Sequence, residues 1–412
     1  MKNIYFMTDF LFHDFSNEST YHNWFFSLLK PIINSIGIIS CYEFKDIINK
    51  NNDTFSRNTF FKISNIENPE FSYYLYDINK ISESSWNYFF NFIDEDDFIL
   101  GFELGKELRE KLNYRNIKFI NFWIHSFKLF YDITFMCNTN DLYIYNTLIK
   151  YQIHNHEFEF FGNFWKTYIK EKKLIYDNNI ENNSILFIGQ MPNDKSVQNG
   201  LKYLNITDYE DKLDALSLKY SKIYYQEHPS LSLLKNNITI DKINLFIKNK
   251  HYIEKLPKNT KTYSLLSSEK IAKVISISSS VIFEARYFGK DTEYLYRPLF
   301  IIDGEFGINT FISINASLWS QKFWADIFQV KGTFSEHSYL NYHKDYIRDI
   351  KNIYFGYDFL DREFSSKNNC SLLNIRMQKV ETSIQNIFME ISKYKYKKNI
   401  LKFKKGYVTT NS

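Results

Sequence analysis

The chain of 412 residues contains few cysteines, glycines and prolines. It has 12 Gly and 6 Pro, too few for a fibrous or linker-rich protein. Its 3 cysteines, Cys41, Cys137 and Cys370, are too few and too far apart for a disulfide framework or a thiolate zinc site. This cysteine usage fits a reducing compartment, so we predict a cytoplasmic protein.

Long hydrophobic runs are also missing. The sequence has no stretch of about 18 uncharged apolar residues, the length that a membrane-spanning helix needs. At the N-terminus, Asp9 interrupts the apolar residues too early for the core of a signal peptide. We therefore predict at most peripheral contact with the inner face of the inner membrane, through the lysines between Lys393 and Lys405. A disordered basic tail explains these lysines equally well.

Several patterns that would indicate other functions are absent. The formal net charge is +4, from 51 Lys and Arg against 47 Asp and Glu, which does not require nucleic acid as a partner. Neither a P-loop motif nor a dinucleotide-binding glycine motif after a strand occurs. The acidic run Asp94–Asp97 is typical of a solvated loop, and His154 and His156 lack the i, i+4 spacing of a zinc site. We predict no metal and no cofactor.

The sequence does contain many apolar residues, and they are arranged in alternating strand and helix patterns. Apolar residues make up 44% and aromatics 19% of the chain, which is enough for the cores of two domains. Strand–helix–strand patterns run from Asp97 to His125 and from Ser184 to Ile302, and residues 127–151 are predicted to be helical. We predict an α/β protein with two Rossmann-like domains facing a cleft.

Three apolar strands of the second unit end in polar residues. The strand Ile185–Gly189 leads to Gln190 and Asp194, Ile223–Gln226 leads to Glu227-His228-Pro229, and Val274–Ile277 leads to Ser278-Ser279-Ser280. In open parallel α/β sheets, ligands bind beyond the carboxyl ends of the strands. We therefore expect these three polar groups to lie around one ligand.

Each group has a chemical and a purely structural interpretation. The serines precede a helix, so their hydroxyls and the free amides could hold a phosphate or simply cap the helix. Pro229 keeps His228 extended, where its imidazole could stabilise a departing phosphate, although the dipeptide could also occur by chance. Asp194 could be a nucleophile or general base and Gln190 could bind hydroxyls, but an Asx turn at Asp194 is the simpler alternative.

In the first unit, Glu103 and His125 also follow strands. Glu103 could be catalytic, or it could be a first-turn carboxylate that stabilises the helix dipole. His125 could contact a substrate, or it could be a partly buried histidine whose hydrogen bonds are satisfied. The residues themselves leave both alternatives open.

The order and spacing of these motifs resemble a family of bacterial glycosyltransferases. Gln190-x-x-x-Asp194 after a strand, then Glu227-His228-Pro229, then Ser278-Ser279-Ser280 at a helix start is similar to GT-B enzymes that use CMP-activated ulosonic acids. That group contains bacterial sialyltransferases and, closer to this chain, the retaining β-Kdo transferases of capsule and lipopolysaccharide assembly. The segments Gly101-Phe-Glu103-Leu and Trp123-Ile-His125 resemble the β-Kdo transferases, and the resemblance covers about residues 97–290.

The resemblance implies roles for these residues. Asp194 would attack the anomeric carbon, Glu103 would assist proton transfer from the acceptor hydroxyl, and His228 would hold the CMP phosphate. Further substrate contacts would come from Gln190, Glu227, Pro229, Ser278, Ser279, Ser280 and His125. The Asp/Glu-Asp-Gly base motif of sialyltransferases is missing, because Asp96-Asp97 is followed by Phe98. This departure weakens an inverting sialyltransferase mechanism.

The resulting prediction is a metal-independent, GT-B-like glycosyltransferase. It would transfer a Kdo-like ulosonic acid from a CMP-sugar to a glycan or glycolipid acceptor by a retaining double displacement. The predicted parts are an acceptor-side domain, a nucleotide-sugar-binding domain, and a helical segment that crosses back and carries the basic tail, at residues 1–175, 176–335 and 336–412. Alternatives are an inverting sialyltransferase using CMP-sialic acid, a non-catalytic nucleotide- or glycan-binding module, and an epimerase that uses a UDP-sugar.

Overall fold

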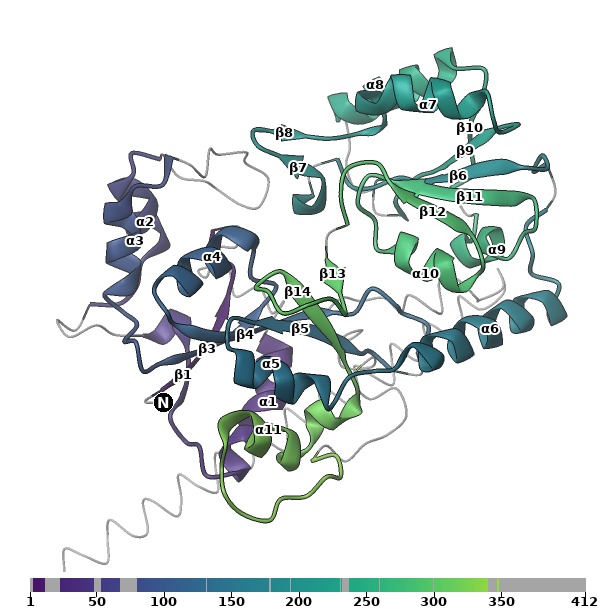
Figure 1. Cartoon of the computed structure of the whole chain (residues 1–412). Coiled ribbons are helices and arrows are strands. Elements are labelled where there is room, and N and C mark those ends of the chain that lie inside the picture. Colours follow the sequence, from purple (N-terminus) through teal and green to yellow (C-terminus); the bar gives the residue numbers. More distant parts are fainter. Residues whose placement is uncertain are drawn as a thin grey trace, which may run out of the picture. The chain divides into compact units, whose positions relative to one another are not determined.

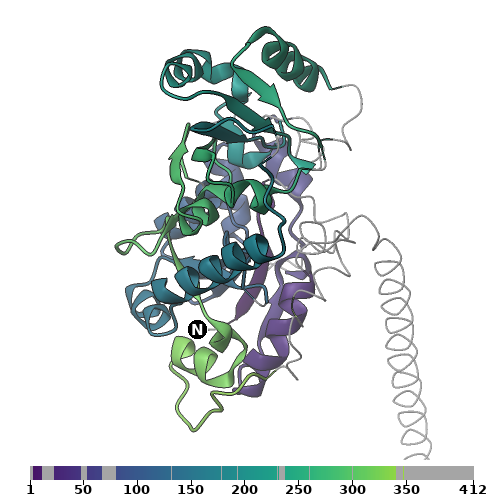
Figure 2. The same ribbon diagram turned by 90° about the vertical axis from the view of Figure 1, so that its right-hand side faces the viewer.

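The computed structural model describes residues 3–11, 23–47, 53–66 and most of 80–339, together with Ile347. Within 80–339 the positions that are not described are 131, 178, 193, 230, 232–236, 259 and 299. The described residues belong to one compact unit that runs from Met1 to Ile350. They form two large β-sheets with helices packed on them (Figure 1; Figure 2).

The first sheet has seven strands in the order β13-β14-β5-β4-β3-β1-β2. They are β1 (Ile4–Thr8), β2 (Cys41–Glu43), β3 (Phe98–Phe102), β4 (Lys118–Ile124), β5 (Phe135–Thr139), β13 (Ile301–Ile302) and β14 (Thr310–Ile314). Strands β2, β1, β3 and β4 are parallel, whereas β5 is antiparallel to both β4 and β14. A parallel Rossmann-like core is therefore extended by the antiparallel strand β5, beyond which β14 and β13 run parallel to each other.

Alternate residues of β1 face two different layers of helices, as the period of a strand requires. Ile4 and Phe6 are buried in a cluster with α1 (Asn23–Ser35), α5 (Leu142–Ile149) and α11 (Gln321–Phe328). Tyr5 and Met7 are buried in another cluster with α2 (Arg57–Ile63), α3 (Glu83–Phe90) and α4 (Lys106–Tyr114). Because both faces are covered, a slip in register would bury the wrong side chains, and the strand ends are held firmly in place.

The second sheet has five parallel strands in the order β10-β9-β6-β11-β12. They are β6 (Ser184–Ile188), β9 (Ile223–Gln226), β10 (Ile253–Lys255), β11 (Ile271–Ser276) and β12 (Asp291–Tyr294). Its helices are α7 (Glu210–Ser217), α8 (Ile238–Asn249), α9 (Thr262–Leu266) and α10 (Val281–Tyr287). Ile185 and Phe187 of β6 pack with α7 and α8, while α10 contacts β11, β12 and α6 (Asn155–Glu171).

Short strands and 3₁₀ helices lie in the connections of both sheets. The two-stranded hairpin of β7 (Gln198–Asn199) and β8 (Lys202–Tyr203) belongs to the loop after β6. Among the described residues, short 3₁₀ helices are η1 (Phe44–Asp46), η3 (Lys195–Val197), η4 (Ile206–Tyr209) and η6 (Ala316–Trp319). Asp194, one of the predicted site residues, lies at the N-cap of η3.

The chain passes between the sheets twice. It leaves the first sheet after α5 and reaches β6 through α6, and it returns after β12, where β13 and β14 extend the first sheet. Both returning strands lie within the range 176–335 predicted for the second domain. Helix α11 then packs into the core of the first sheet. Most of the predicted helical segment at 336–412, including its lysine-rich tail, lies outside the described residues.

The predicted α/β fold with two Rossmann-like sheets is confirmed. The helix predicted across residues 127–151 is wrong, because residues 135–139 form β5 and helix α5 begins only at Leu142. Every residue of β5 is buried, so the polar–apolar alternation that would mark a half-exposed strand is lost from its sequence.

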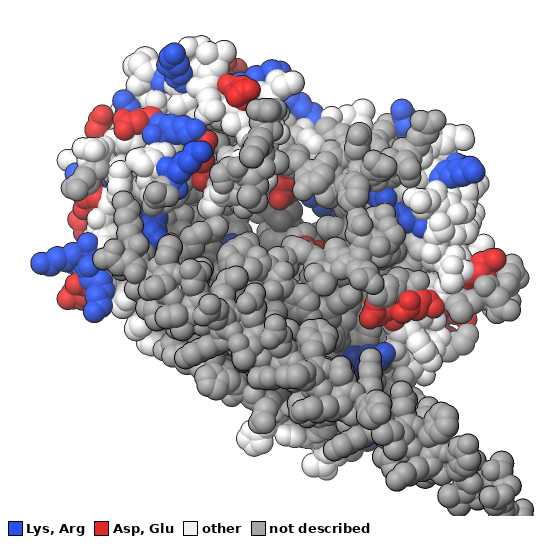
Figure 3. Space-filling model, turned by 180° about the vertical axis from the view of Figure 1, so that it is seen from behind, with Lys and Arg blue, Asp and Glu red and all other residues white. Residues whose placement is uncertain are grey.

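The surface gives two further observations. Among the described helices, none combines the length and apolar character that crossing a bilayer requires. On the described part of the face in Figure 3, Lys and Arg side chains are interspersed with Asp and Glu. Mixed charges of this kind largely cancel, so this face does not present a field of one sign to a ligand.

Candidate active site

The carboxyl ends of three neighbouring strands in the second sheet are in register. Ile188 at the end of β6 pairs with Gln226 of β9 and with Ser276 of β11. Adjacent strands lie about 4.8 Å apart, so the turns after the outer two of these strands start about 10 Å from each other. The residues two positions beyond the three paired strand ends are Gln190, His228 and Ser278.

Gln190 joins the loop after β6 to the loop after β11. Its Nε2 donates to Ser196 Oγ at 2.9 Å and to Ser278 Oγ at 3.0 Å. Its Oε1 accepts from Ser278 N at 2.8 Å and from Ser276 Oγ at 3.2 Å. The side-chain amide therefore holds two of the three polar turns against each other, and contact with a substrate hydroxyl stays a prediction.

Asp194 lies exposed on the loop that Gln190 braces. It is the N-cap of η3, and its Oδ1 accepts the Ser196 amide at 2.7 Å. This is the Asx-type cap that the residue pattern allows. The cap does not bury the carboxylate, so the side chain is both fixed in direction and open to solvent.

The three serines differ in their surroundings. Ser278 is buried, and its Oγ donates to Ser196 O at 2.6 Å. Ser279 Oγ accepts the Val281 amide at 3.3 Å, which leaves its hydroxyl proton available to another acceptor. Ser280 is the N-cap of α10 and makes no side-chain cap hydrogen bond. Ser278 thus shapes the turn, and contact of Ser279 and Ser280 with a ligand stays a prediction.

His228 follows β9 at the other side of β6. The residue is half-buried, and its carbonyl accepts the Leu231 amide at 3.0 Å, so the chain turns directly after it. The neighbouring Glu227 forms an ion pair with Lys255 of β10. Burial and the charge of Glu227 together raise the pKa of the Tyr225 hydroxyl well above its usual range. The charge of Glu227 is therefore compensated by Lys255 of the neighbouring strand.

In the first sheet, Glu103 occupies a backbone conformation that is unusual for its residue type. It directly follows β3 with φ of +57°, in the left-handed region, which costs a non-glycine residue about 1 kcal/mol or more. The turn is held by main-chain donors: Glu103 N donates to Phe122 O at 2.8 Å and Leu104 N donates to Asn121 Oδ1 at 2.8 Å. Such strain persists only where the surroundings enforce it.

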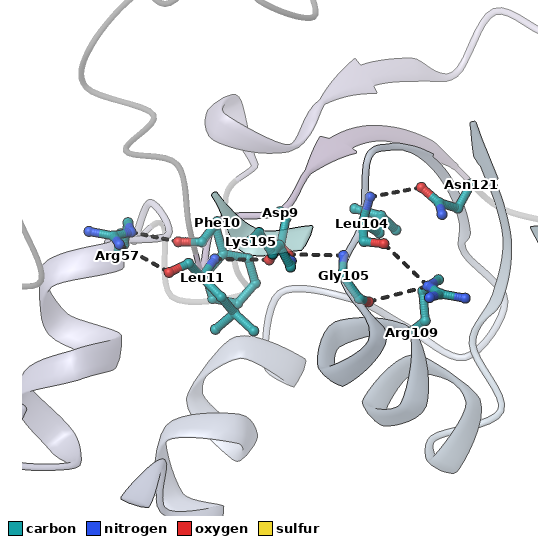
Figure 4. A network of polar contacts seen from close by, with 9 residues as sticks. All are labelled: Asp9, Phe10, Leu11, Arg57, Leu104, Gly105, Arg109, Asn121 and Lys195. Atoms are coloured by element: carbon teal, nitrogen blue, oxygen red, sulfur yellow. Dashed lines mark hydrogen bonds and ion pairs between the residues drawn. The ribbon is translucent and has the colours of Figure 1, made fainter. Parts of the chain in front are cut away.

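A buried polar network enforces this turn (Figure 4). Arg109 of α4 donates from Nε to the carbonyls of Leu104 and Gly105 at 3.2 and 3.3 Å, and from Nη1 to the carbonyl of Ile308. Burial lowers the pKa of Arg109 to about 10, so the guanidinium stays charged at neutral pH. Asn121 extends the network by donating to Asn138 Oδ1 at 3.0 Å.

One ion pair joins the first sheet to the loop of Asp194. Asp9 follows β1, is 1% exposed, and accepts from the amides of Leu11 at 3.1 Å and Gly105 at 2.9 Å. Its Oδ2 also accepts from Lys195 Nζ at 2.5 Å (Figure 4). A Cβ atom at Gly105 would collide with both charged groups, so this close approach requires glycine.

His125 lies in the core of the molecule. Its Nδ1 accepts the Phe127 amide at 2.8 Å, so Nε2 carries the proton and donates to Ser313 Oγ at 2.9 Å. Burial lowers the pKa of His125 to about 3, and the ring stacks on Phe158. Ser313 Oγ donates in turn to Asp303 at 3.2 Å. Both ring nitrogens therefore have protein partners, which is the arrangement of a satisfied buried histidine, and a substrate contact stays a prediction.

The structure thus groups the predicted residues of the second sheet and links them to Glu103 of the first. The residues that sequence reasoning missed are Asp9, Lys195, Asn121 and Arg109. Asp9 could have been found by the rule used for the other candidates, because it is the first polar residue after the end of its strand. The other three make contacts that depend on distant parts of the chain and leave no local pattern.

Comparisons with known proteins give the following results. No protein-family profile matches the sequence, and no curated protein sequence matches it. Among the described residues, no group of three or more His, Cys, Asp or Glu side chains is arranged to hold a metal ion.

Several solved structures show similarity to this chain, and three of them are the following. The β-Kdo 2,7 transferase of KpsC from Thermosulfurimonas dismutans is 12% identical with a TM-score of 0.37, over 72% of this chain and 80% of that one. The β-Kdo 2,4 transferase of KpsC from the same organism is 15% identical with a TM-score of 0.32, over 47% and 67%. The UDP-GlcNAc 2-epimerase from Neisseria meningitidis is 12% identical with a TM-score of 0.25, over 72% and 82%. At these TM-scores the similarities define no reaction for this chain.

Proposed function

We propose that this protein is a glycosyltransferase that transfers a Kdo-like ulosonic acid from a CMP-sugar to a glycan or glycolipid acceptor. The observation that carries the proposal is the register of β6, β9 and β11. It puts the turns of Gln190, His228 and Ser278 at one edge of a parallel sheet, where ligands of such sheets bind. The motifs in these turns resemble, in order and spacing, those of transferases that use CMP-ulosonic acids.

The donor phosphate would lie between His228 and the hydroxyls of Ser279 and Ser280. A CMP-sugar leaves with a single phosphate, whose charge an imidazole and two hydroxyls can stabilise by hydrogen bonds. The proposed enzyme therefore needs no metal and no cofactor, and addition of EDTA should leave its rate unchanged. Placement of the protein in the cytoplasm, with peripheral membrane contact, belongs to the same proposal.

The exposed carboxylate of Asp194 would serve as nucleophile. In the first step its oxygen forms a bond to the anomeric carbon while the bond from that carbon to the phosphate oxygen breaks, and CMP leaves. In the second step an acceptor hydroxyl attacks the same carbon, Glu103 takes the hydroxyl proton, and the bond to Asp194 breaks. Two inversions give net retention at the anomeric centre.

Donor specificity tests the proposal first. CMP, UDP and GDP are compared for thermal stabilisation of the protein, and CMP-Kdo and CMP-sialic acid are then compared for consumption. We expect stabilisation by CMP and consumption of CMP-Kdo. Stabilisation by UDP alone would instead favour a UDP-sugar epimerase, and CMP binding without consumption of either donor would favour a non-catalytic binding module.

Stereochemistry tests the mechanism. Mass spectrometry of the protein quenched during turnover should find a sugar attached to the peptide that contains Asp194. An inverting sialyltransferase acts in one displacement, leaves no adduct, and gives the opposite anomer. Consumption of CMP-sialic acid with inversion would therefore replace the double displacement by this alternative.

A further inference from the structure

Asp9 lies at the topological switch point of the first sheet. Strand β1 has β2 on one side and β3 on the other. The chain leaves β1 toward α1 on one face of the sheet and leaves β3 toward α4 on the other face, so the two connections diverge at this position. In open α/β sheets the crevice at the carboxyl ends of such diverging strands is the usual ligand site. Here Lys195, from the loop after β6 of the second sheet, points its ammonium group into that position.

The carboxylate of Asp9 is held rigidly by its surroundings. It accepts two main-chain amides in addition to Lys195, and its side chain is 1% exposed, against 29% for the Lys195 side chain. The adjoining turn is fixed as well, because Arg57 donates from Nε to Phe10 O at 2.5 Å and from Nη2 to Leu11 O at 3.2 Å. Loss of Lys195 would leave this buried carboxylate without the cation that contacts it, which is strongly destabilising.

Each partner of the ion pair is connected to the turn of a candidate catalytic residue. Lys195 follows Asp194 in the chain and is part of η3, which Asp194 caps. Asp9 accepts the amide of Gly105, two residues after Glu103. The path from one carboxylate to the other therefore runs through one ion pair and one main-chain hydrogen bond.

We infer that Asp9 and Lys195 are positioning residues that set the place of Asp194 relative to Glu103. The inference rests on the proposed function for the roles of those two carboxylates. In the proposed function, in contrast, the CMP phosphate is held by His228, Ser279 and Ser280 of the second sheet. Loss of the ion pair should therefore lower the rate of transfer while leaving nucleotide binding intact.

Four variants separate positioning from stability. Lys195→Met removes the cation, and Lys195→Arg keeps it. The double variant Asp9→Asn with Lys195→Met removes both charges, so it leaves no unpaired carboxylate in the interior. Lys202→Met is the matched control, because Lys202 lies in the same loop after β6 but forms its ion pair with Asp208 rather than with Asp9.

Kinetics on the CMP-sugar that the wild-type protein consumes give the main readout. We expect Lys195→Met and the double variant to lose roughly 10- to 100-fold in kcat, the effect of a displacement of about 1 Å at a reacting group. KM for the donor and thermal stabilisation by CMP should stay within about twofold of wild type. Lys195→Arg should recover most of the rate, and Lys202→Met should retain all of it. A double variant with wild-type kcat would overturn the inference.

Hydrogen exchange gives a readout that needs no activity. In Lys195→Met and in the double variant, the amides of Leu11, Gly105 and Ser196 should exchange faster, and in Lys202→Met they should not. Unchanged exchange at Ser196 in Lys195→Met and in the double variant would show that the ion pair does not hold the loop. If the wild-type protein consumes no CMP-sugar, the proposed function fails, whereas this measurement still decides whether the ion pair positions the Asp194 loop.

Discussion

Replacement of Gln190 by leucine is the most direct test of the site in the second sheet. The side chain makes four hydrogen bonds to Ser196, Ser276 and Ser278, with lengths from 2.8 to 3.2 Å. Each such bond contributes about 1 kcal/mol net, so their loss costs at most about 4 kcal/mol. Gln190 is half-buried, so water can replace some of the lost hydrogen bonds. We therefore expect a loss of about 2–3 kcal/mol in the free energy of unfolding.

Gln190→Glu is the matched control for this change. It keeps an oxygen that can accept from Ser278 N and Ser276 Oγ, but it loses both Nε2 donors. We therefore expect the free energy of unfolding to fall by about half as much as in Gln190→Leu. Urea unfolding monitored by tryptophan fluorescence, with and without CMP, measures both effects.

The two variants should also differ in ligand binding. In Gln190→Leu the loops after β6 and β11 lose their main connection. The apparent affinity for CMP, measured from its stabilisation of the protein, should therefore fall roughly tenfold. If Gln190→Leu unfolds at the wild-type urea concentration and binds CMP as wild type does, the loops are held by other contacts and the account of this edge is wrong.

Three further outcomes are expected. Asp194→Asn should lower transfer by roughly 10³-fold or more with CMP stabilisation unchanged, because the amide cannot displace the phosphate; an active variant would exclude the nucleophile. His228→Ala should lower kcat by roughly 10²-fold with a small change in thermal stability, and wild-type turnover would remove His228 from the mechanism. Burial lowers the pKa of His125 from 6.5 to about 3, so as the pH falls the imidazole is protonated in the unfolded chain before it is protonated in the folded protein. The free energy of unfolding should therefore rise with pH between about 3 and 6.5, and His125→Asn should flatten that rise; equal slopes in the two proteins would contradict the buried neutral imidazole.

The sequence predicted the strand ends better than it predicted their connections. Apolar runs followed by polar residues located Gln190, His228 and Ser278. This worked because the burial of a parallel strand and the exposure of its loop can both be recognised from the local composition. Strand β5 was missed for the same reason, since a short strand buried on both faces has no alternation to distinguish it from a helix.

What the sequence could not show is which distant groups meet. The pair Asp9 and Lys195 is separated by 186 positions, and each residue alone is an ordinary charged side chain. Likewise, the left-handed backbone of Glu103 depends on Arg109 and Asn121, whose contacts exist only once α4 and β4 are packed. Local patterns therefore located candidates, and tertiary contacts decide how they are held.

The double passage of the chain between the two sheets limits how these halves can move. A single linker would allow them to swivel in any direction, whereas two separate connections, through α6 and between β12 and β13, leave mainly a bending motion about one axis. A bend that opened the two halves at this ion pair would separate Asp9 from Lys195. A pair of spectroscopic labels on the two sides of that ion pair would therefore report opening and closing along a single coordinate, and substrate entry could be followed as a change in one distance.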